Sequence, residues 1–319
     1  MSMLNRNAEA LFWVGRYVER AENHARLIDV HYHIQQTADF QDEEHKWERL
    51  IDALGARYAY EQQFEAFTER DVLSFITLDR GYPNSLFSCV AHSRNNLRTL
   101  REKLPSEMWD VLNAFYLWLG EKQVDDIMKD SPHVFYRQIK ERMAMFQGVE
   151  HSVMQRQNEW HFIESGRLLE RTENTVRILQ SVTGTLSVEA ASPYPSMLAV
   201  LKSVSGYQAF RRFYADGMSE RHIMEFMINS VSFPRSIQFS FTELEKHLKG
   251  IQLEGHGQHL PHEKAVRQVG KLKAELACLD DEDFVPERVS AILDHLTSSC
   301  LGLGGTMAAA FFQLEEVGA

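Results

Sequence analysis

Residues 15–26 read G-R-Y-V-E-R-A-E-N-H-A-R, and residues 166–177 read G-R-L-L-E-R-T-E-N-T-V-R. Seven of these twelve positions are identical at an offset of 151 residues, which is 166 minus 15, whereas average amino-acid usage gives about one chance match. The same offset, without a gap, pairs Leu50 with Leu201, Gly55 with Gly206, Pro83 with Pro234 and Ser85 with Ser236. The chain is therefore predicted to be a tandem duplication of one helical unit, with a first repeat over 1–153 and a second over 154–319. We expect the halves to pack as one globular unit about a pseudo-twofold axis, because such an axis brings equivalent surfaces together.

The spacing of apolar residues predicts helices along most of the chain. Residues 8–36 contain one apolar stripe with steps of three or four residues, formed by Val14, Val18, Ala21, Ala25 and Ile28. Such a stripe is typical of a helix with one face toward a core. Proline is scarce, at eight residues, and no run of strict alternation predicts a strand. The sequence therefore predicts an all-α fold, a helical bundle.

Breaks between helices are predicted from glycine, proline and serine. Residues 43–67 are expected to form one helix, and residues 134–182, which contain no proline, either one long helix or two helices joined at a kink near Gly148. The segment 183–195 is rich in breakers and is predicted to be the clearest linker, and 250–261 is predicted to be a loop.

The overall composition excludes several classes of function. Hydrophobic residues make up 44% and charged residues 25% of the 319 residues, which is typical of a globular protein and not of a disordered one. The net charge of −11, from 45 acidic and 34 basic side chains, repels phosphate backbones and anionic lipids. We therefore expect no nucleic-acid partner and no membrane partner.

The cysteines and the two ends of the sequence indicate a cytoplasmic location. Cys89, Cys278 and Cys300 are far apart and form no C-x-x-C pair, as expected in a reducing compartment. We interpret all three as buried thiols. Charged residues interrupt the N-terminal segment, so neither a signal peptide nor a spanning helix is predicted there, and the apolar run 300–312 is too short to cross a bilayer.

The duplicated stretch carries a polar face that we call a ladder. Residues three, four, seven and eleven apart share one face of a helix. The first ladder consists of Arg16, Glu19, Asn23 and Arg26, flanked by Arg20 and Glu22, and the second of Arg167, Glu170, Asn174 and Arg177, flanked by Arg171 and Glu173. If the ladders are buried, each charge needs a partner, because an isolated ion in a protein interior costs several kcal/mol.

Two interpretations of the ladders remain open. In the structural one, Glu22 pairs with Arg26 and Glu173 with Arg177, and the other charges form salt bridges that set the register of the halves. In the functional one, the ladders face each other across the pseudo-axis and line a cleft. Arginines there bind carboxylate or phosphate, and glutamates bind an amine or act as acid or base. A peptide or amino-acid-like ligand carries both charges and fits this cleft.

Gly15 and Gly166 precede the ladders at equivalent positions. Glycine inside a helix costs about 1 kcal/mol relative to alanine. Close approach of another helix or of a ligand would explain this cost, and we favour helix packing.

No metal or cofactor site is predicted. Di-iron and di-manganese bundles use Glu-x-x-His motifs, but the residues three positions after Glu19 and Glu170 are glutamates. His256, His259 and His262 have better spacing for a metal, yet they lie in a segment with glycine and proline that is interpreted as a solvated loop. Neither a phosphate-binding glycine loop nor a G-x-S-x-G elbow occurs.

Four stretches together resemble the alpha-E domain family of bacterial proteins. They are L-F-W-V-G-R-Y-V-E-R-A-E-N-H-A-R-L-I-D-V at 11–30, the second copy over 160–178, R-N-N-L-R-T-L-R-E-K-L-P-S-E-M-W at 94–109, and F-P-R-S at 233–236. The resemblance implies a helical protein encoded beside circularly permuted ATP-grasp proteins and transglutaminase-like proteins. It therefore implies a role in ATP-dependent amide- or peptide-bond formation, or in modifying a peptide. The sequence departs from the family at Asn95, where the usual residue is glutamate.

Three hypotheses for the function follow. The favoured one is a non-catalytic partner of an ATP-grasp ligase that captures a peptide substrate in the Arg/Glu-lined cleft. In the second, the protein is an enzyme that acts on an amide or peptide, with Glu19 or Glu170 as the catalytic general base. The third is a helical scaffold without a ligand.

Overall fold

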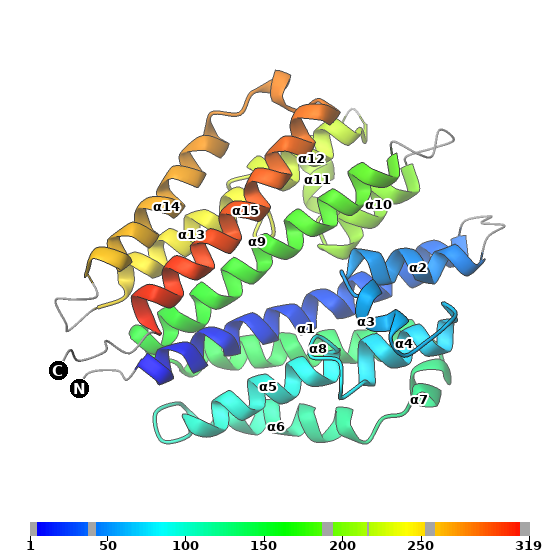
Figure 1. Ribbon diagram of the computed structural model, residues 1–319, viewed down its shortest axis with the longest axis horizontal. Coiled ribbons are helices and arrows are strands. Elements are labelled where there is room, and N and C mark those ends of the chain that lie inside the picture. The colour runs from blue at the N-terminus through cyan, green and yellow to red at the C-terminus, as the bar shows by residue number, and fades with distance from the viewer. Residues whose placement is uncertain (1–4, 38–42, 187–193, 216, 253–258, 313–319) are drawn as a thin grey trace. The chain divides into compact units, whose positions relative to one another are not determined.

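The computed structural model describes residues 5–37, 43–186, 194–215, 217–252 and 259–312 (Figure 1). Within these ranges every regular element is a helix, which confirms the all-α prediction. The helices are α1 (Asn5–Thr37), α2 (Glu43–Ala53), α3 (Arg57–Glu61), α4 (Glu69–Leu78), α5 (Leu86–Thr99), α6 (Ser106–Gly120), α7 (Val124–Met128), α8 (Pro132–Val153), α9 (Asn158–Leu186), α10 (Tyr194–Ser203), α11 (Tyr207–Phe213), α12 (Glu220–Asn229), α13 (Ile237–Gly250), α14 (His259–Ala277), the short 3-10 helix η2 (Asp281–Asp283) and α15 (Pro286–Phe311).

The chain forms two compact units, each assembled from segments far apart in sequence. Unit 1 comprises Met1–Arg16, Met154–Val176 and Arg221–Ala319, and unit 2 comprises Tyr17–Val153 and Arg177–Glu220. The long helices α1 and α9 therefore contribute residues to both units. The repeat boundary between residues 153 and 154 and the pseudo-twofold axis stay predictions.

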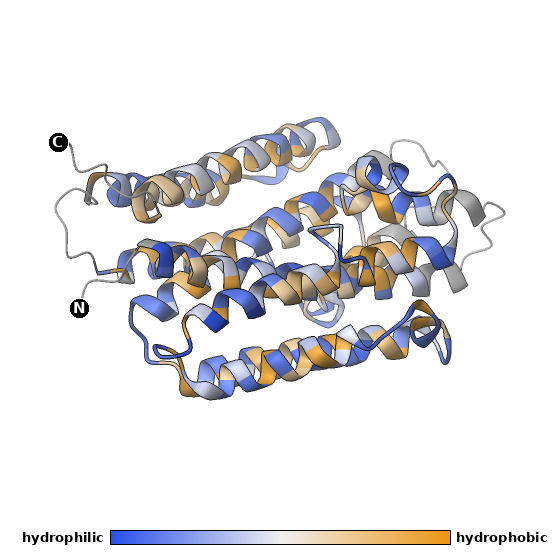
Figure 2. Ribbon diagram, turned by 60° about the horizontal axis from the view of Figure 1, so that its bottom comes forward, coloured by the Kyte–Doolittle hydropathy of each residue, from blue (hydrophilic) through white to orange (hydrophobic). Residues whose placement is uncertain are grey.

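In unit 1, α14 packs against both α13 and α15, and the three helices lie side by side (Figure 1). Their core consists of residues at helical spacing, among them Leu244, Val269 and Leu293, all fully buried. Hydrophilic and hydrophobic residues alternate along the ribbons as the stripes of amphipathic helices (Figure 2). Burial of these apolar stripes is the main stabilisation of the bundle.

In unit 2, α6 packs against α5 and α8, while α4 packs against α5 and α7. Leu73, Leu112 and Ile139 are fully buried in this core. The Tyr136 hydroxyl, also buried, makes a 2.7 Å hydrogen bond with the Thr77 hydroxyl. This bond satisfies a polar pair that would otherwise be costly in the interior.

Two serines at the predicted offset make the same helix cap. The Ser85 hydroxyl oxygen accepts the backbone N–H of Ser88 at the start of α5, and Ser236 accepts the N–H of Phe239 at the start of α13. Each hydroxyl also donates to a backbone carbonyl six residues earlier, that of Asp79 or Ser230. This local geometry agrees with the predicted pairing of Ser85 with Ser236.

The predicted pairing of Gly55 with Gly206 is wrong by one residue. Gly55 ends α2 at φ +64°, and Ser205 ends α10 at φ +55°. In both turns the next amide donates back to a carbonyl five residues earlier, from Ala56 to Ile51 and from Gly206 to Leu201, as in a Schellman motif. The local offset is therefore 150, and Gly206, with φ −92°, does not occupy the left-handed position.

Several predicted helix boundaries are corrected by the structure. Residues 43–67 form α2 and α3 instead of one helix, and the segment 134–182 breaks after Val153 instead of near Gly148. The start of α9 is held by a distant residue, because the Asn158 side chain makes two 2.8 Å hydrogen bonds with the backbone of Gln252. α9 continues to Leu186, so the predicted linker 183–195 is helical at its start, and residues 187–193 lie outside the described residues.

The three cysteines differ in their exposure. Cys89 and Cys300 are buried, but Cys278 is exposed, so the prediction of a buried thiol is wrong there. None of the helices in the described part of the chain is both long enough and apolar enough to span a membrane.

Candidate functional site

Arg16 is the centre of a buried ion cluster in unit 1. Its Nη1 and Nη2 donate to the two carboxylate oxygens of Glu173 at 2.8 Å each. Its Nε lies 2.7 Å from Oε2 of Glu170. Arg16 is 8% exposed and Glu170 2%, so one guanidinium from α1 pairs with two carboxylates from α9 in a largely water-free place.

Other side chains of unit 1 complete this cluster. Asn174 donates to Glu170 at 3.2 Å, and the buried Arg167 pairs with Glu164. The thiol of Cys300 lies in the field of Glu173 and Arg16, and its pKa is raised to about 12, mainly by burial. Each charged side chain of the cluster therefore has a partner of opposite charge, as buried charges must have to be tolerated.

The two ladder glycines lie where α1 and α9 approach each other in unit 1. A Cβ added to Gly15 would lie 2.0 Å from the carbonyl oxygen of Ile163, and one added to Gly166 would lie 2.0 Å from that of Phe12. These distances leave no room for a side chain. Close helix packing thus explains both glycines, and it places Arg16, the residue after Gly15, directly against α9.

The part of the first ladder in unit 2 is also largely paired. Glu22, 4% exposed, accepts from Nε of Arg26 at 2.8 Å and from Nε2 of Gln147 at 2.6 Å. Asn23 donates to the buried Glu19 at 3.2 Å, and Arg26 also donates to the Ser205 hydroxyl at 2.7 Å. The predicted pair of Glu22 with Arg26 is confirmed.

The arginine that directly follows each ladder glutamate, Arg20 after Glu19 and Arg171 after Glu170, donates a hydrogen bond to a turn. In unit 2, Nη1 of Arg20 donates to the side-chain oxygen of Asn84 at 2.7 Å. In unit 1, Nη1 of Arg171 donates to the backbone carbonyl of Pro234 at 3.3 Å. Each turn directly precedes the serine that caps α5 or α13. Arg20 and Arg171 therefore have a positioning role in the fold.

Arg177 is the most accessible ladder residue, because its side chain is exposed. It lies in unit 2, close enough to the Tyr82 hydroxyl to affect its titration. Burial raises the pKa of Tyr82, while its hydrogen bond with Asn84 and the charges of Arg177 and Arg20 act in the opposite direction. Arg177 is thus an exposed guanidinium in the field of the buried Tyr82, and an exposed guanidinium can bind an anionic group.

The structure brings the predicted site residues together in two groups. Arg16, Glu170, Glu173 and Asn174 meet in unit 1, with Arg167 on Glu164, whereas Glu19, Glu22, Asn23 and Arg26 meet in unit 2. Glu173 binds Arg16, which is not the partner assigned to it by the i,i+4 prediction. A single cleft that all of them share stays a prediction.

A third buried acid on the ladder face of α1, after Glu19 and Glu22, was not predicted from the sequence. Asp29, 4% exposed, lies 2.6 Å from Nδ1 of His133 and also pairs with Lys140. Asp29 is seven residues after Glu22, so the helical spacing could have revealed it. Its partners on α8, and likewise Gln147, Asn84 and Ser205, could not be found from α1 alone.

No metal site is found in the part of the chain that the structure describes. There, no group of three or more histidine, cysteine, aspartate or glutamate side chains could hold a metal ion. Of the three predicted loop histidines, His262 lies on α14, with its Nε2 2.7 Å from the carbonyl oxygen of Leu248. His259 begins α14, and its side chain, like His256, lies outside the described residues.

A histidine pair lies beside the Arg167–Glu164 pair in unit 1. Nδ1 of His161 is 3.1 Å from Nδ1 of His247, so one nitrogen donates and the other accepts. The pKa of His247 is lowered to about 4, mainly by burial; His161 and Arg167 act in the same direction, and Glu164 and Glu243 act against it. The pKa of His161 is also lowered by burial. The pair is therefore neutral at neutral pH.

This pair predicts a loss of stability in mild acid. The unfolded chain takes up a proton at His247 near its ordinary pKa of 6.5, but the folded protein does so only near pH 4. The contribution of His247 to stability is thus full above pH 6.5, falls as the pH drops toward 4, and changes no further below it, for a loss of at most about 3 kcal/mol. Urea unfolding between pH 7 and 4 should show this slope, and H247Q should flatten it. The exposed His295 supplies the control, since an equal flattening by H295Q would contradict the assignment.

Comparison with known proteins identifies one family and distant relatives. A family model, Alpha-E, described as a predicted alpha-helical domain with a conserved ER motif, matches residues 3–312. Uncharacterized proteins of Mycobacterium bovis and Mycobacterium tuberculosis are 26% identical over 258 residues. The match covers 76% of this chain but 29% of each relative, so the chain spans less than a third of their length. No solved structure matches the chain.

Proposed function

Because the chain belongs to the Alpha-E family, we propose that it is a non-catalytic, cytoplasmic partner in a bacterial system that forms amide or peptide bonds with ATP. A circularly permuted ATP-grasp protein is the proposed partner that performs the chemistry, and a transglutaminase-like protein is a second one. The chain itself captures a peptide or amino-acid-like ligand through ladder arginines.

The burial of the ladder glutamates carries the non-catalytic part of this proposal. Glu19 is 0% exposed and Glu170 2%. A general base must come within about 3 Å of the proton that it removes, or reach it through one water. Glu170 faces Arg16 and accepts from Asn174 instead, and Glu19 accepts from Asn23. Both carboxylates are used to stabilise the fold.

The arginines of unit 2 supply the ligand-binding part. Arg177 is exposed, and Arg20 is fixed by Asn84 close to the same Tyr82 hydroxyl. A guanidinium can bind a carboxylate or phosphate with two parallel hydrogen bonds. A peptide carboxylate, or the acyl phosphate that an ATP-grasp enzyme makes from it, has this chemistry.

The length of the relatives supports a role beside other polypeptide segments. In the mycobacterial proteins, the matched region is 29% of the chain. The remaining length of those proteins leaves room for further domains joined covalently to the matched region. A domain that works next to a ligase is compatible with either arrangement, fused or encoded separately.

The test combines the purified protein with the proposed partner, a circularly permuted ATP-grasp protein. We expect no amide product from this protein alone, and faster product formation by the ligase when it is added. R177E should weaken binding of the ligase's peptide substrate about tenfold, since losing a charge-assisted hydrogen bond costs on the order of 1.5 kcal/mol. R212E is the matched control, because Arg212 is an exposed arginine of unit 2 on α11.

Two other outcomes would decide against the proposal. Amide turnover by the purified protein alone that is abolished by E19Q or E170Q would identify an enzyme with a glutamate base. Failure to bind either the ligase or its peptide substrate would identify a scaffold without a ligand. Thermal unfolding of each variant separates loss of binding from loss of folding.

A further inference from the structure

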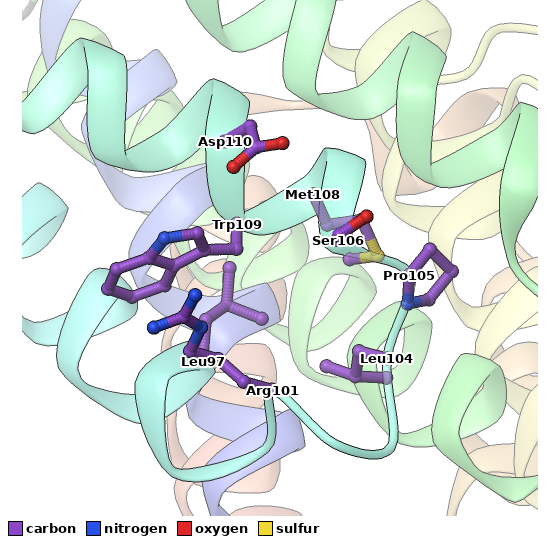
Figure 3. A pocket seen from close by; sticks show the side chains of 8 residues that line it. All are labelled: Leu97, Arg101, Leu104, Pro105, Ser106, Met108, Trp109 and Asp110. Atoms are coloured by element: carbon purple, nitrogen blue, oxygen red, sulfur yellow. The ribbon is translucent and has the colours of Figure 1, made fainter.

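A small pocket lies in unit 2 between the end of α5 and the start of α6 (Figure 3). It encloses about 110 Å³, well below the roughly 300–1,000 Å³ of ordinary small-molecule sites. Leu97 and Met108, both buried, line it together with the half-buried Leu104 and Pro105. Its size and lining fit a single aliphatic side chain.

One wall of the pocket is preformed by stacked cations and aromatic rings. Trp109 has the guanidinium of Arg101 4.8 Å from its ring centre and that of Arg94 4.9 Å away. Arg94 is itself fixed, since it donates to Asn113 at 2.8 Å and lies 4.5 Å from the Tyr116 ring centre. A wall held in this way loses little freedom when a ligand binds.

The cation that lines the pocket is Arg101. Its side chain is exposed, and it forms no ion pair with a carboxylate among the residues that the structure describes. Figure 3 shows the Arg101 guanidinium beside the Trp109 indole at the pocket.

We propose that this pocket binds a segment of a partner polypeptide that inserts one aliphatic side chain and places a carboxylate on Arg101. The apolar lining selects the aliphatic side chain, and Arg101, which has no carboxylate partner within the described residues, selects an acidic neighbour. Asp110, which also lines the pocket, can accept a backbone N–H of the bound segment. The site is independent of the ladders and of the proposed ligase substrate.

The experiment uses three peptides with the full-length protein. The probe is acetyl-Glu-Leu-Glu-amide, acetyl-Gln-Leu-Gln-amide lacks the carboxylates, and acetyl-Glu-Ser-Glu-amide lacks the aliphatic side chain. Binding is followed by the NMR signal of the Trp109 indole N–H, assigned with W109F. We expect the acidic leucine peptide to bind about tenfold more tightly than either analogue.

Variants of the rim test the assigned roles. R101Q should reduce the preference for the acidic over the glutamine peptide to less than about twofold, and R101K should keep most of it. S106F should block all three peptides by covering the mouth. K264Q, at an exposed lysine of α14 in unit 1, should change nothing. Equal binding of the three peptides, or no shift of the Trp109 signal up to about 5 mM acidic leucine peptide, would overturn the proposal.

Discussion

Replacing Gly15 with alanine is expected to destabilise unit 1 by about 3 kcal/mol or more, at the upper end of what overpacking costs. The new Cβ would lie 2.0 Å from the carbonyl oxygen of Ile163 and 2.8 Å from the backbone nitrogen of Arg167. Backbone atoms cannot rotate away as a side chain can. The two helix segments must therefore separate, which also pulls Arg16 from Glu170 and Glu173. G166A meets the carbonyl of Phe12 at the same distance and should behave alike.

Gly148 is the matched control for this prediction. It lies within α8, and nothing is within 4 Å of a Cβ built on it. G148A should stabilise the protein by up to about 1 kcal/mol, because alanine is the better helix former. Urea unfolding followed by circular dichroism measures both effects, which have opposite signs. If G15A were as stable as G148A, the close approach of α1 and α9 would be refuted.

Replacing Arg16 with methionine should cost about 3–5 kcal/mol, the usual result of removing one partner of a buried ion pair. The aliphatic part of the side chain is kept, so the loss is electrostatic. Glu170 and Glu173 would remain beside each other without their shared cation, and Glu170 is 2% exposed. The drop in the urea midpoint of unfolding measures this cost.

A charge-neutral combination distinguishes ion pairing from packing. R16M/E170Q/E173Q removes the two carboxylate charges as well and should recover more than half of the lost stability, because no unpaired ion remains. R137M is the surface control, since Arg137 and Glu141 are both exposed and 3.8 Å apart. It should change stability by less than about 0.5 kcal/mol. A triple variant no more stable than R16M would show that the guanidinium acts through its packing.

These two predictions bear on the function as well as on the fold. The glycines and Arg16 together bring α1 and α9 into contact within unit 1, and this contact buries Glu170. The packing that stabilises the Arg16 cluster therefore also shields Glu170, a predicted general base, from solvent. The ladder residue that a ligand in solution can reach is an arginine, Arg177 in unit 2.

Much of the local structure is determined by the sequence itself. The apolar stripe of α1, the serine caps of α5 and α13, and the pairs Asn23–Glu19 and Asn174–Glu170 all depend on residues at most four positions apart. Such contacts follow from helix geometry alone. Gly15 and Gly166 likewise indicate close helix packing, but the sequence does not show which helix packs against them.

The tertiary structure alone decided which distant residues meet. Arg16 has Glu173 as its partner, 157 positions away, although the i,i+4 spacing assigned that glutamate to Arg177. Asn158 at the start of α9 meets Gln252, and His161 meets His247 of α13. The turn after α10 places Ser205, one residue before the predicted position, in the left-handed conformation. Helical periodicity states which face of a helix is buried, but it carries no information about the surface that covers it. The choice among distant partners is made by how the helices fit together in each unit.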